Sequence, residues 1–203
     1  PHSNSMEFCA DIVKGALDRC GVSECYVAGH SLGGYISFEL QKRYPELVKG
    51  IIMINSNTYA DSEDVASSRE KEINFILSGR HLALASIAIP NMFKKDNLRR
   101  MDDKIQEIIE IADTHDPEGI AASVRGMASR QDNTEYISSL DTPVLAFFGD
   151  SDQFFPLDQV NKLMASLPKA ECHIVPNSGH DSYLEEPQFV ADRILKFVTK
   201  GSC

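Results

Sequence analysis

Hydrophobic residues at the start of the chain follow first a helical and then a strand-like pattern. Phe8 and Ile12 recur at helical spacing within residues 6–19, and Gly21 supplies a stop. The apolar run 25–28 that follows is too short for a helix, so it predicts a buried strand.

The next stretch repeats the same order of elements. Residues 35–44 predict a helix that Pro45 closes, and the β-branched run 48–54 predicts a second strand. A chain that alternates helix and strand in this way is typical of a parallel sheet with right-handed crossovers.

The pattern changes between residues 56 and 141, where strand-like runs vanish. Charged helical patterns take their place, with breaks at Pro90 and Pro117. The three predicted helical segments are 62–77, 98–112 and 117–129. A helical block inserted into such a sequence indicates a cap over an active site.

Strand-like runs then return. The predicted elements are a strand at 144–148, a helix at 157–167, a strand at 172–175 and a last helix at 187–199. The chain therefore predicts an α/β fold, a parallel sheet flanked by helices with an inserted helical cap. The predicted division is core 1–56, cap 57–140 and core 141–203.

Composition and charge narrow the class of partner. The hydrophobic fraction of 42% and charged fraction of 25% are those of an ordinary soluble globular protein. The formal net charge of −10 disfavours binding to nucleic acid or to anionic membranes. No uninterrupted apolar run approaches the roughly 20 residues of a membrane span. We therefore expect neither nucleic acid nor membrane as a partner, and the sequence leaves the oligomeric state open.

The cysteines indicate a reducing, cytoplasmic environment. They are odd in number and lack the C-x-x-C spacing of a structural zinc site. No His, Asp and Glu cluster has metal-ligand spacing, so no metal or cofactor is implied. The cysteines are Cys9, Cys20, Cys25, Cys172 and Cys203.

A candidate nucleophile lies between the first predicted strand and the helix after it. The segment reads Gly29-His30-Ser31-Leu32-Gly33, a G-x-S-x-G motif in the strand-to-helix setting that such a motif needs. A sharp turn here strains the serine backbone, and a Cβ at either flank is expected to clash. The N–H of Leu32 is a candidate oxyanion donor. The alternative is a tight turn with an incidental serine.

The candidate base is His180, because it lies in a loop directly after a predicted strand and before the last helix. Sites of parallel sheets lie at the carboxyl ends of strands. A surface histidine is the alternative. His30 belongs to the turn itself and is expected to pack beneath it. The remaining histidines are His2, His81, His115 and His173.

The candidate acid follows the strand at 144–148, where Asp150 and Asp152 both occur. The order serine, acid, histidine along the chain suits either one. The residues alone leave open whether Asp152 is the acid or instead caps a turn beside Asp150. Asn55, after the preceding strand, is not ionisable and is set aside as an acid.

The motifs together resemble the α/β-hydrolase superfamily, in its capped serine esterase branch. They read VAGHSLGG, TPVLAFFGDSDQFFP and VPNSGHDSYLEEPQFV. The resemblance covers the chain outside the cap and includes acyl-carrier methyl ester esterases. Its Gly-x-x-Asp-x-x-x-Pro pattern fits Gly149, Asp152 and Pro156, which ranks Asp152 above Asp150.

The resemblance implies a serine hydrolase that cleaves a small-molecule carboxylic ester through an acyl-enzyme, with the triad Ser31, Asp152 and His180. Carbon–carbon bond hydrolysis, lactone hydrolysis and acyl transfer are alternatives on the same triad. A further alternative is a ligand-binding homologue that acts as a receptor.

The resemblance also implies that four strands of the family precede Pro1. The second oxyanion N–H would then lie outside this chain, and the strand at 25–28 would be an exposed edge.

The cap is expected to set substrate choice. Phe154 and Phe155, just past the acid, are expected to line the same pocket from below as substrate-binding residues. Ordinary core packing is the alternative for both.

Overall fold

The computed structural model describes residues 3–200 and contains a parallel sheet of 4 strands in the order β1-β2-β3-β4. The strands are β1 (Cys25–His30), β2 (Val48–Ile54), β3 (Val144–Gly149) and β4 (Glu171–Val175). All pairs are parallel, which confirms the predicted sheet, and β1 lies at its edge as expected.

Successive strand residues face opposite sides of the sheet, so each side has its own core. Ile51 and Met53 belong to the larger cluster of buried residues, whereas Ile52 and Ile54 belong to a second cluster. This burial on both faces explains why residues 51–54 of β2 form a continuous apolar run and not an alternating one.

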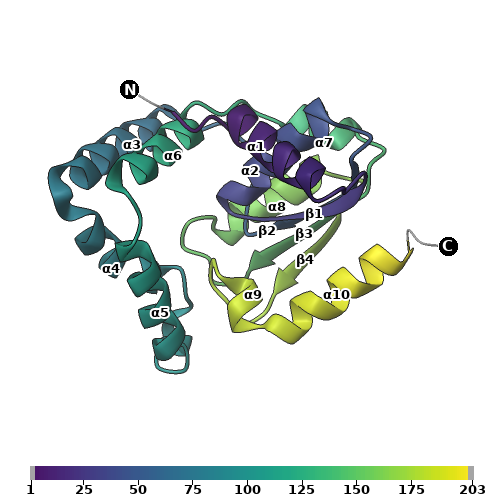
Figure 1. Ribbon diagram of the computed structural model, residues 1–203. Coiled ribbons are helices and arrows are strands. Elements are labelled where there is room, and N and C mark those ends of the chain that lie inside the picture. Colours follow the sequence, from purple (N-terminus) through teal and green to yellow (C-terminus); the bar gives the residue numbers. More distant parts are fainter. Residues whose placement is uncertain (1–2, 201–203) are drawn as a thin grey trace.

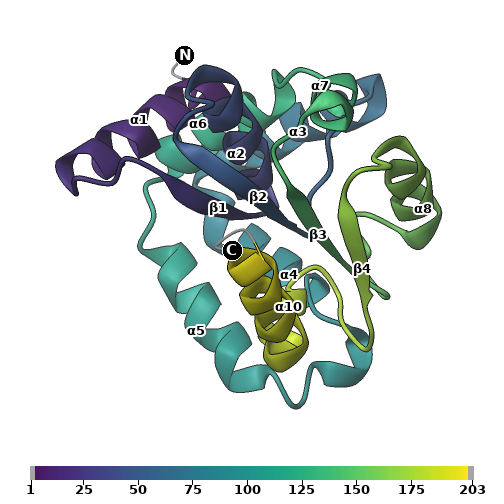
Figure 2. The same ribbon diagram turned by 90° about the vertical axis from the view of Figure 1, so that its right-hand side faces the viewer.

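Helices cover both faces. The larger core packs against α1 (Met6–Arg19), α2 (Leu32–Arg43) and α8 (Leu157–Ser166). The second packs against α10 (Pro187–Lys200), which follows the short α9 (Ser182–Glu185). In both views α1 and α2 lie above the sheet and α10 lies below it (Figures 1 and 2).

The segment between β2 and β3 is helical, as predicted. In it α3 packs against α6 and α4 against α5, beyond the carboxyl ends of the strands (Figure 1). The last helix, α7, instead joins the larger core through Ile137. The elements are α3 (Glu63–Phe75), η1 (Ile76–Arg80), α4 (His81–Asn91), η2 (Lys95–Asn97), α5 (Asp102–Asp113), α6 (Pro117–Ala128) and α7 (Thr134–Ser139). The division at residues 57 and 140 stays a prediction, and its outer limits, residues 1–2 and 201–203, lie outside the described residues.

The main difference from the predicted elements is α4. Its sequence is apolar almost all round, so it has no amphipathic period from which a helix could be predicted. The expected break at Pro90 is wrong, because Pro90 lies in the last turn and the helix continues to Asn91.

One stretch of the described residues 3–200, Glu63–Asn91, is long and apolar enough, by length and composition only, to cross a membrane. It has 29 residues and a mean hydropathy of 1.3. Gly79, with φ of 79°, interrupts its helical geometry. Length and composition are weak evidence for a span, and the absence of a membrane partner stays a prediction.

Candidate active site

Ser31 occupies a strained turn between β1 and α2. Its φ is 49° and its ψ is −113°, a backbone conformation that non-glycine residues rarely adopt. Its N–H donates to the carbonyl of Ile54 on the neighbouring strand, at 3.0 Å. The predicted strain is therefore present, and Leu32 begins the helix, where N–H groups lack partners within the helix.

The two glycines of the motif differ in what they permit. A Cβ on Gly29 would lie 2.2 Å from the backbone carbonyl of Gly33, so only glycine fits at this position. A Cβ on Gly33 would meet nothing within 4 Å. The expectation that both flanks exclude a side chain is confirmed for Gly29 and wrong for Gly33. The tight approach is instead shared by Gly34, whose Cβ would lie 2.3 Å from Oγ of Ser56.

His180 and Asp152 form a buried pair. Nδ1 of His180 lies 2.8 Å from Oδ2 of Asp152, and their side chains are 8% and 2% exposed. The other carboxylate oxygen, Oδ1, accepts the N–H groups of Phe154 and Phe155, at 2.8 Å and 3.2 Å. Burial raises the pKa of Asp152, but the hydrogen bonds and the charge of His180 outweigh it, so that pKa lies below its ordinary value. The carboxylate is thus ionised and holds a proton on Nδ1 of His180.

Asp150 has a different place. Its carboxylate accepts the N–H groups of Asn177 and Ser178, at 2.8 Å and 3.2 Å, and the hydroxyl of Ser151 at 2.8 Å. It therefore organises the start of the loop that carries His180. Of the two candidate acids, the structure places Asp152 against the imidazole.

His30 joins the turn of Ser31 to the loop of His180. Its Nε2 donates to the carbonyl of His180 at 2.9 Å and lies 3.3 Å from Oδ1 of Asp181. Its ring centroid is 5.0 Å from that of His180. Burial first, and the charge of His180 second, lower the pKa of His30 to about 4, so its ring is neutral near pH 7. This contact brings the loops of Ser31 and His180 to the same edge of the sheet.

Asn55 is a residue that sequence reasoning set aside. It is 1% exposed and has φ of 43° at the end of β2. Its Nδ2 donates to Oδ2 of Asp152 and to the carbonyl of Gly179, both at 3.1 Å, and its Oδ1 accepts the hydroxyl of Ser182. Asn55 therefore fixes the carboxylate of Asp152. Its position directly after a parallel strand was the available signal.

The two phenylalanines after the acid have separate environments. Phe154 is 52% exposed, and its ring centroid lies 5.1 Å from that of His180. Phe155 is 4% exposed and belongs to the larger core, against Phe148 and Tyr59. Core packing accounts for Phe155, while Phe154 stays a candidate substrate contact.

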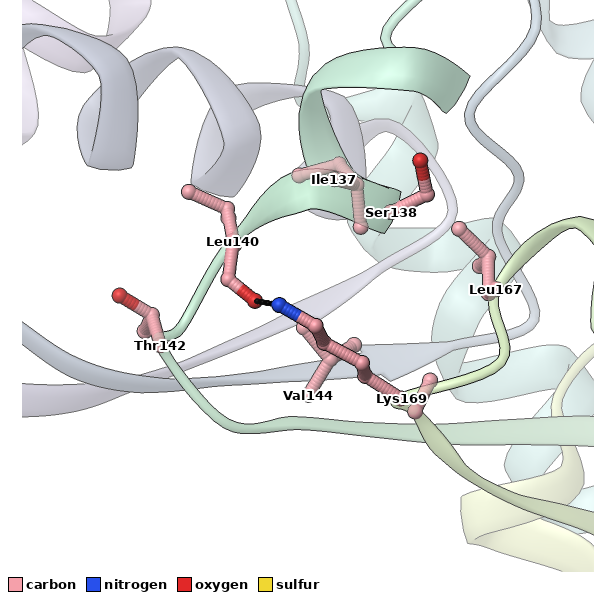
Figure 3. A pocket seen from close by; sticks show the side chains of 8 residues that line it. Ile137, Ser138, Leu140, Thr142, Val144, Leu167 and Lys169 are labelled. Carbon is pink, nitrogen blue, oxygen red and sulfur yellow. Dashed lines mark hydrogen bonds between the residues drawn. The ribbon is translucent and has the colours of Figure 1, made fainter.

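Two hollows lie elsewhere on the molecule. One of about 10 Å³, enough for about one water, lies between α7 and the start of β3 (Figure 3). The other has about 300 Å³. Both are lined by Val144 and Lys169, at the amino ends of the strands. They are therefore distant from the candidate triad, which follows the carboxyl ends of the strands.

Among residues 3–200, no group of three or more His, Cys, Asp or Glu side chains could hold a metal ion.

The arrangement has the parts needed to activate a hydroxyl. A serine lies on a strained, half-buried turn, a histidine lies at the same edge, and a buried carboxylate holds the histidine in one tautomer. Such a constellation supports nucleophilic attack on an acyl carbon.

Comparisons with known proteins identify the family and the fold. The family model of the alpha/beta hydrolase fold matches residues 1–187. A 2-hydroxy-6-oxononadienedioate/2-hydroxy-6-oxononatrienedioate hydrolase of Paraburkholderia phymatum is 25% identical over 207 residues, covering 93% of this chain and 67% of that protein.

Solved structures give the same result for the fold. A thermophilic esterase from Thermogutta terrifontis, with malate bound, matches with a TM-score of 0.92 at 25% identity, over 99% of this chain and 74% of that chain. An enol-lactonase from Burkholderia xenovorans LB400 matches with a TM-score of 0.87 at 20% identity, over 98% of this chain and 75% of that chain. The second likeness concerns the fold alone.

Proposed function

We propose that this chain, which belongs to the alpha/beta hydrolase fold family, is a serine hydrolase. In this proposal it cleaves a small-molecule carboxylic ester through an acyl-enzyme. The observation that supports this most directly is the buried pair of His180 and Asp152, whose Nδ1 and Oδ2 atoms lie 2.8 Å apart. His30 joins the loop of His180 to the turn of Ser31. Small acyl or methyl esters are the proposed substrates.

In the proposed reaction Oγ of Ser31 attacks the ester carbonyl carbon while Nε2 of His180 takes the hydroxyl proton. The N–H of Leu32 stabilises the oxyanion of the tetrahedral intermediate. His180 then gives the proton to the departing alcohol, which leaves the acyl group on Ser31. A water molecule, deprotonated by His180, then attacks the acyl carbon. The bond from that carbon to Oγ of Ser31 breaks, His180 returns the proton to Oγ, and the acid is released. Asp152 stays ionised and stabilises the imidazolium in both half-reactions.

A second candidate is hydrolysis of a carbon–carbon bond next to a ketone. The similarity to a hydrolase whose named substrates are oxo acids, and not esters, supports it. Both candidates use the same three side chains, so the substrate decides between them. A panel of p-nitrophenyl esters beside 2-hydroxy-6-oxo dienoates separates them by kcat/KM.

The test of a serine hydrolase is covalent labelling by a fluorophosphonate together with burst kinetics on a p-nitrophenyl ester. Ser31→Ala is expected to abolish labelling and to lower kcat by about 10⁴-fold or more. Ser37→Ala is the matched control: this serine is 2% exposed on α2, the helix that follows Ser31, and its hydroxyl donates to the carbonyl of Gly33. Labelling that persists in Ser31→Ala would refute the proposal. A single burst without further turnover would favour a receptor.

A further inference from the structure

The cap is bonded directly to the backbone of the candidate base. The carbonyl of Met92, at the end of α4, accepts the N–H of His180 at 2.6 Å and that of Asp181 at 3.1 Å. The contact leaves no room for a side chain, since a Cβ on Gly179 would lie 2.5 Å from the same carbonyl oxygen. The residues after α4 and the loop of His180 thus form one packed unit.

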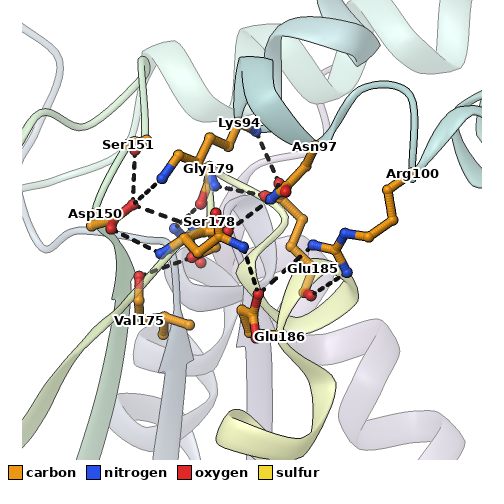
Figure 4. Close-up of polar contacts among 12 residues, drawn as sticks. Lys94, Asn97, Arg100, Asp150, Ser151, Val175, Ser178, Gly179, Glu185 and Glu186 are labelled. Carbon is orange, nitrogen blue, oxygen red and sulfur yellow. Dashed lines mark hydrogen bonds and ion pairs between the residues drawn. The ribbon is translucent and has the colours of Figure 1, made fainter.

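A buried carboxylate lies at the centre of this unit. Glu185 is 1% exposed, although it carries a charged side-chain type. Its Oε1 accepts the N–H of Lys94 at 3.0 Å and Nδ2 of Asn97 at 2.8 Å, both from the cap. Its Oε2 accepts the N–H of Gly179 at 2.6 Å, one residue before His180. Figure 4 shows the side chain reaching both segments.

The three contacts of this carboxylate are all N–H donors, which is what an acceptor-only carboxylate requires. Hydrogen bonds to an ionised acceptor are roughly twice as strong as neutral ones. One oxygen is bonded to the cap and the other to the histidine loop, so the carboxylate fixes the distance between the two. A buried carboxylate that loses its donors is strongly destabilised, which disfavours separation of the two segments.

The neighbouring carboxylate, Glu186, provides a comparison. Its Oε1 accepts a hydrogen bond from Nδ2 of Asn177 at 3.0 Å and lies 3.7 Å from Nη2 of Arg100. Its side chain is 32% exposed. Its partners are those of a surface pair, and such pairs contribute about 0–1 kcal/mol. Two adjacent glutamates therefore differ in burial and in what they join (Figure 4).

We propose that Glu185 is a positioning residue that locks the cap segment 92–97 to the loop of His180, so that the placement of the cap sets the position of the base. This inference rests on the proposed function, because position matters only if His180 transfers protons to and from Ser31. Displacement of a reacting group by about 1 Å costs about 10²-fold in rate.

The kinetic test compares Glu185→Gln with Glu186→Gln in the full chain, with kcat expressed per active site titrated by the fluorophosphonate. In Glu185→Gln the amide turns two hydrogens toward N–H donors, so kcat per titrated site is expected to fall by about 10²-fold with little change in KM. Glu186→Gln is expected to stay within about fivefold of the unmodified chain. Unchanged kcat per titrated site in Glu185→Gln would show a merely structural role and overturn the proposal.

A second readout does not depend on activity. Amide hydrogen exchange at Lys94, Gly179 and His180 is expected to accelerate in Glu185→Gln and not in Glu186→Gln. Asn97→Ala covers the case in which Glu185→Gln does not fold. It removes the bonds of Nδ2 to Glu185 and to the carbonyl of Asn177 but keeps the bond from the N–H of Lys94. It is expected to accelerate the same amides and to lower kcat. Unaltered exchange in the folded variants would refute the lock even if the chain proves not to be a serine hydrolase. Failure of Ser31 labelling, by contrast, would refute the proposed function alone.

Discussion

Replacing Asp152 by asparagine exchanges one carboxylate oxygen for an NH₂ group, with almost no change in shape. The site makes this exchange severe. The side chain is 2% exposed, and its oxygens face donors: the imidazole Nδ1–H of His180, Nδ2 of Asn55 and the N–H groups of Phe154 and Phe155. An amide has one acceptor oxygen and two hydrogens to donate, so one side of the site must be mismatched.

Two orientations of the new amide are available. With its oxygen toward Phe154 and Phe155, its NH₂ donates to Nδ1 of His180 and forces the proton onto Nε2, where the imidazole can no longer accept one from Ser31. With its oxygen toward His180, the NH₂ opposes two backbone N–H groups, each of which costs about 1–3 kcal/mol when unsatisfied. The first orientation opposes only Nδ2 of Asn55, which keeps its bond to the carbonyl of Gly179. The first orientation is therefore favoured.

The expected effect is a loss of kcat of about 10⁴-fold, as for a triad held in the wrong tautomer. That factor corresponds to about 5 kcal/mol of transition-state stabilisation. The matched control is Asp150→Asn. Its carboxylate is 31% exposed and bonds to Ser151 and to the loop backbone, so a loss of at most about tenfold is expected.

The assay is steady-state hydrolysis of a p-nitrophenyl ester by both variants, with thermal unfolding to confirm that each is folded. An equal or larger loss in Asp150→Asn would refute the assignment of the acid. A loss of less than about tenfold in folded Asp152→Asn would refute the tautomer argument itself.

Two further predictions concern the surroundings of the base. Phe154→Ala, which opens space beside His180, is expected to shift the kcat/KM ratio between long and short acyl esters by about tenfold. Phe8→Ala is the control, because Phe8 is equally exposed, at 52%, but lies on α1. An unchanged ratio in Phe154→Ala would exclude the pocket role. His30→Gln tests how protonation of His30 affects folding stability. In the unfolded chain His30 takes a proton near its ordinary pKa of 6.5, whereas in the folded chain its pKa is about 4. The residue therefore lowers the free energy of unfolding as the pH falls from about 6.5 to about 4. Burial raises the pKa of Asp181 to about 6, so this residue has the opposite effect on the free energy of unfolding and stabilises the fold as the pH falls below about 6. The free energy of unfolding by urea, measured for His30→Gln, should therefore rise relative to that of the unmodified chain as the pH is lowered from about 7 to about 4.5. Parallel curves of the two unfolding free energies against pH would contradict this.

Local patterns were sufficient for most of the scaffold. The predicted helix 6–19 and strand 48–54 have the same bounds in the structure, because the signals that define them lie within the segment or beside it. The side chain of Ser5 caps the first helix through the N–H of Phe8, and residues 51–54 of the strand are apolar because both faces are buried there.

The location of the candidate site also followed from the sequence. Ser31, Asp152 and His180 each come after a predicted strand, and the carboxyl ends of parallel strands meet at one edge. The choice between Asp150 and Asp152 is different. The residues alone allowed both, and the family resemblance ranked Asp152 first. The direction of each side chain, set by packing of the turn against the histidine loop, is what places Asp152 and not Asp150 against the imidazole.

Other features depended wholly on tertiary contacts. Asn55 bonds to Asp152, 97 positions away, and Glu185 bonds to the N–H of Lys94, 91 positions away. Neither residue has a local pattern that indicates its partner. A polar side chain is positioned by whichever donor the fold brings within hydrogen-bond distance, and that distance depends on the packing of whole elements, which no local pattern contains.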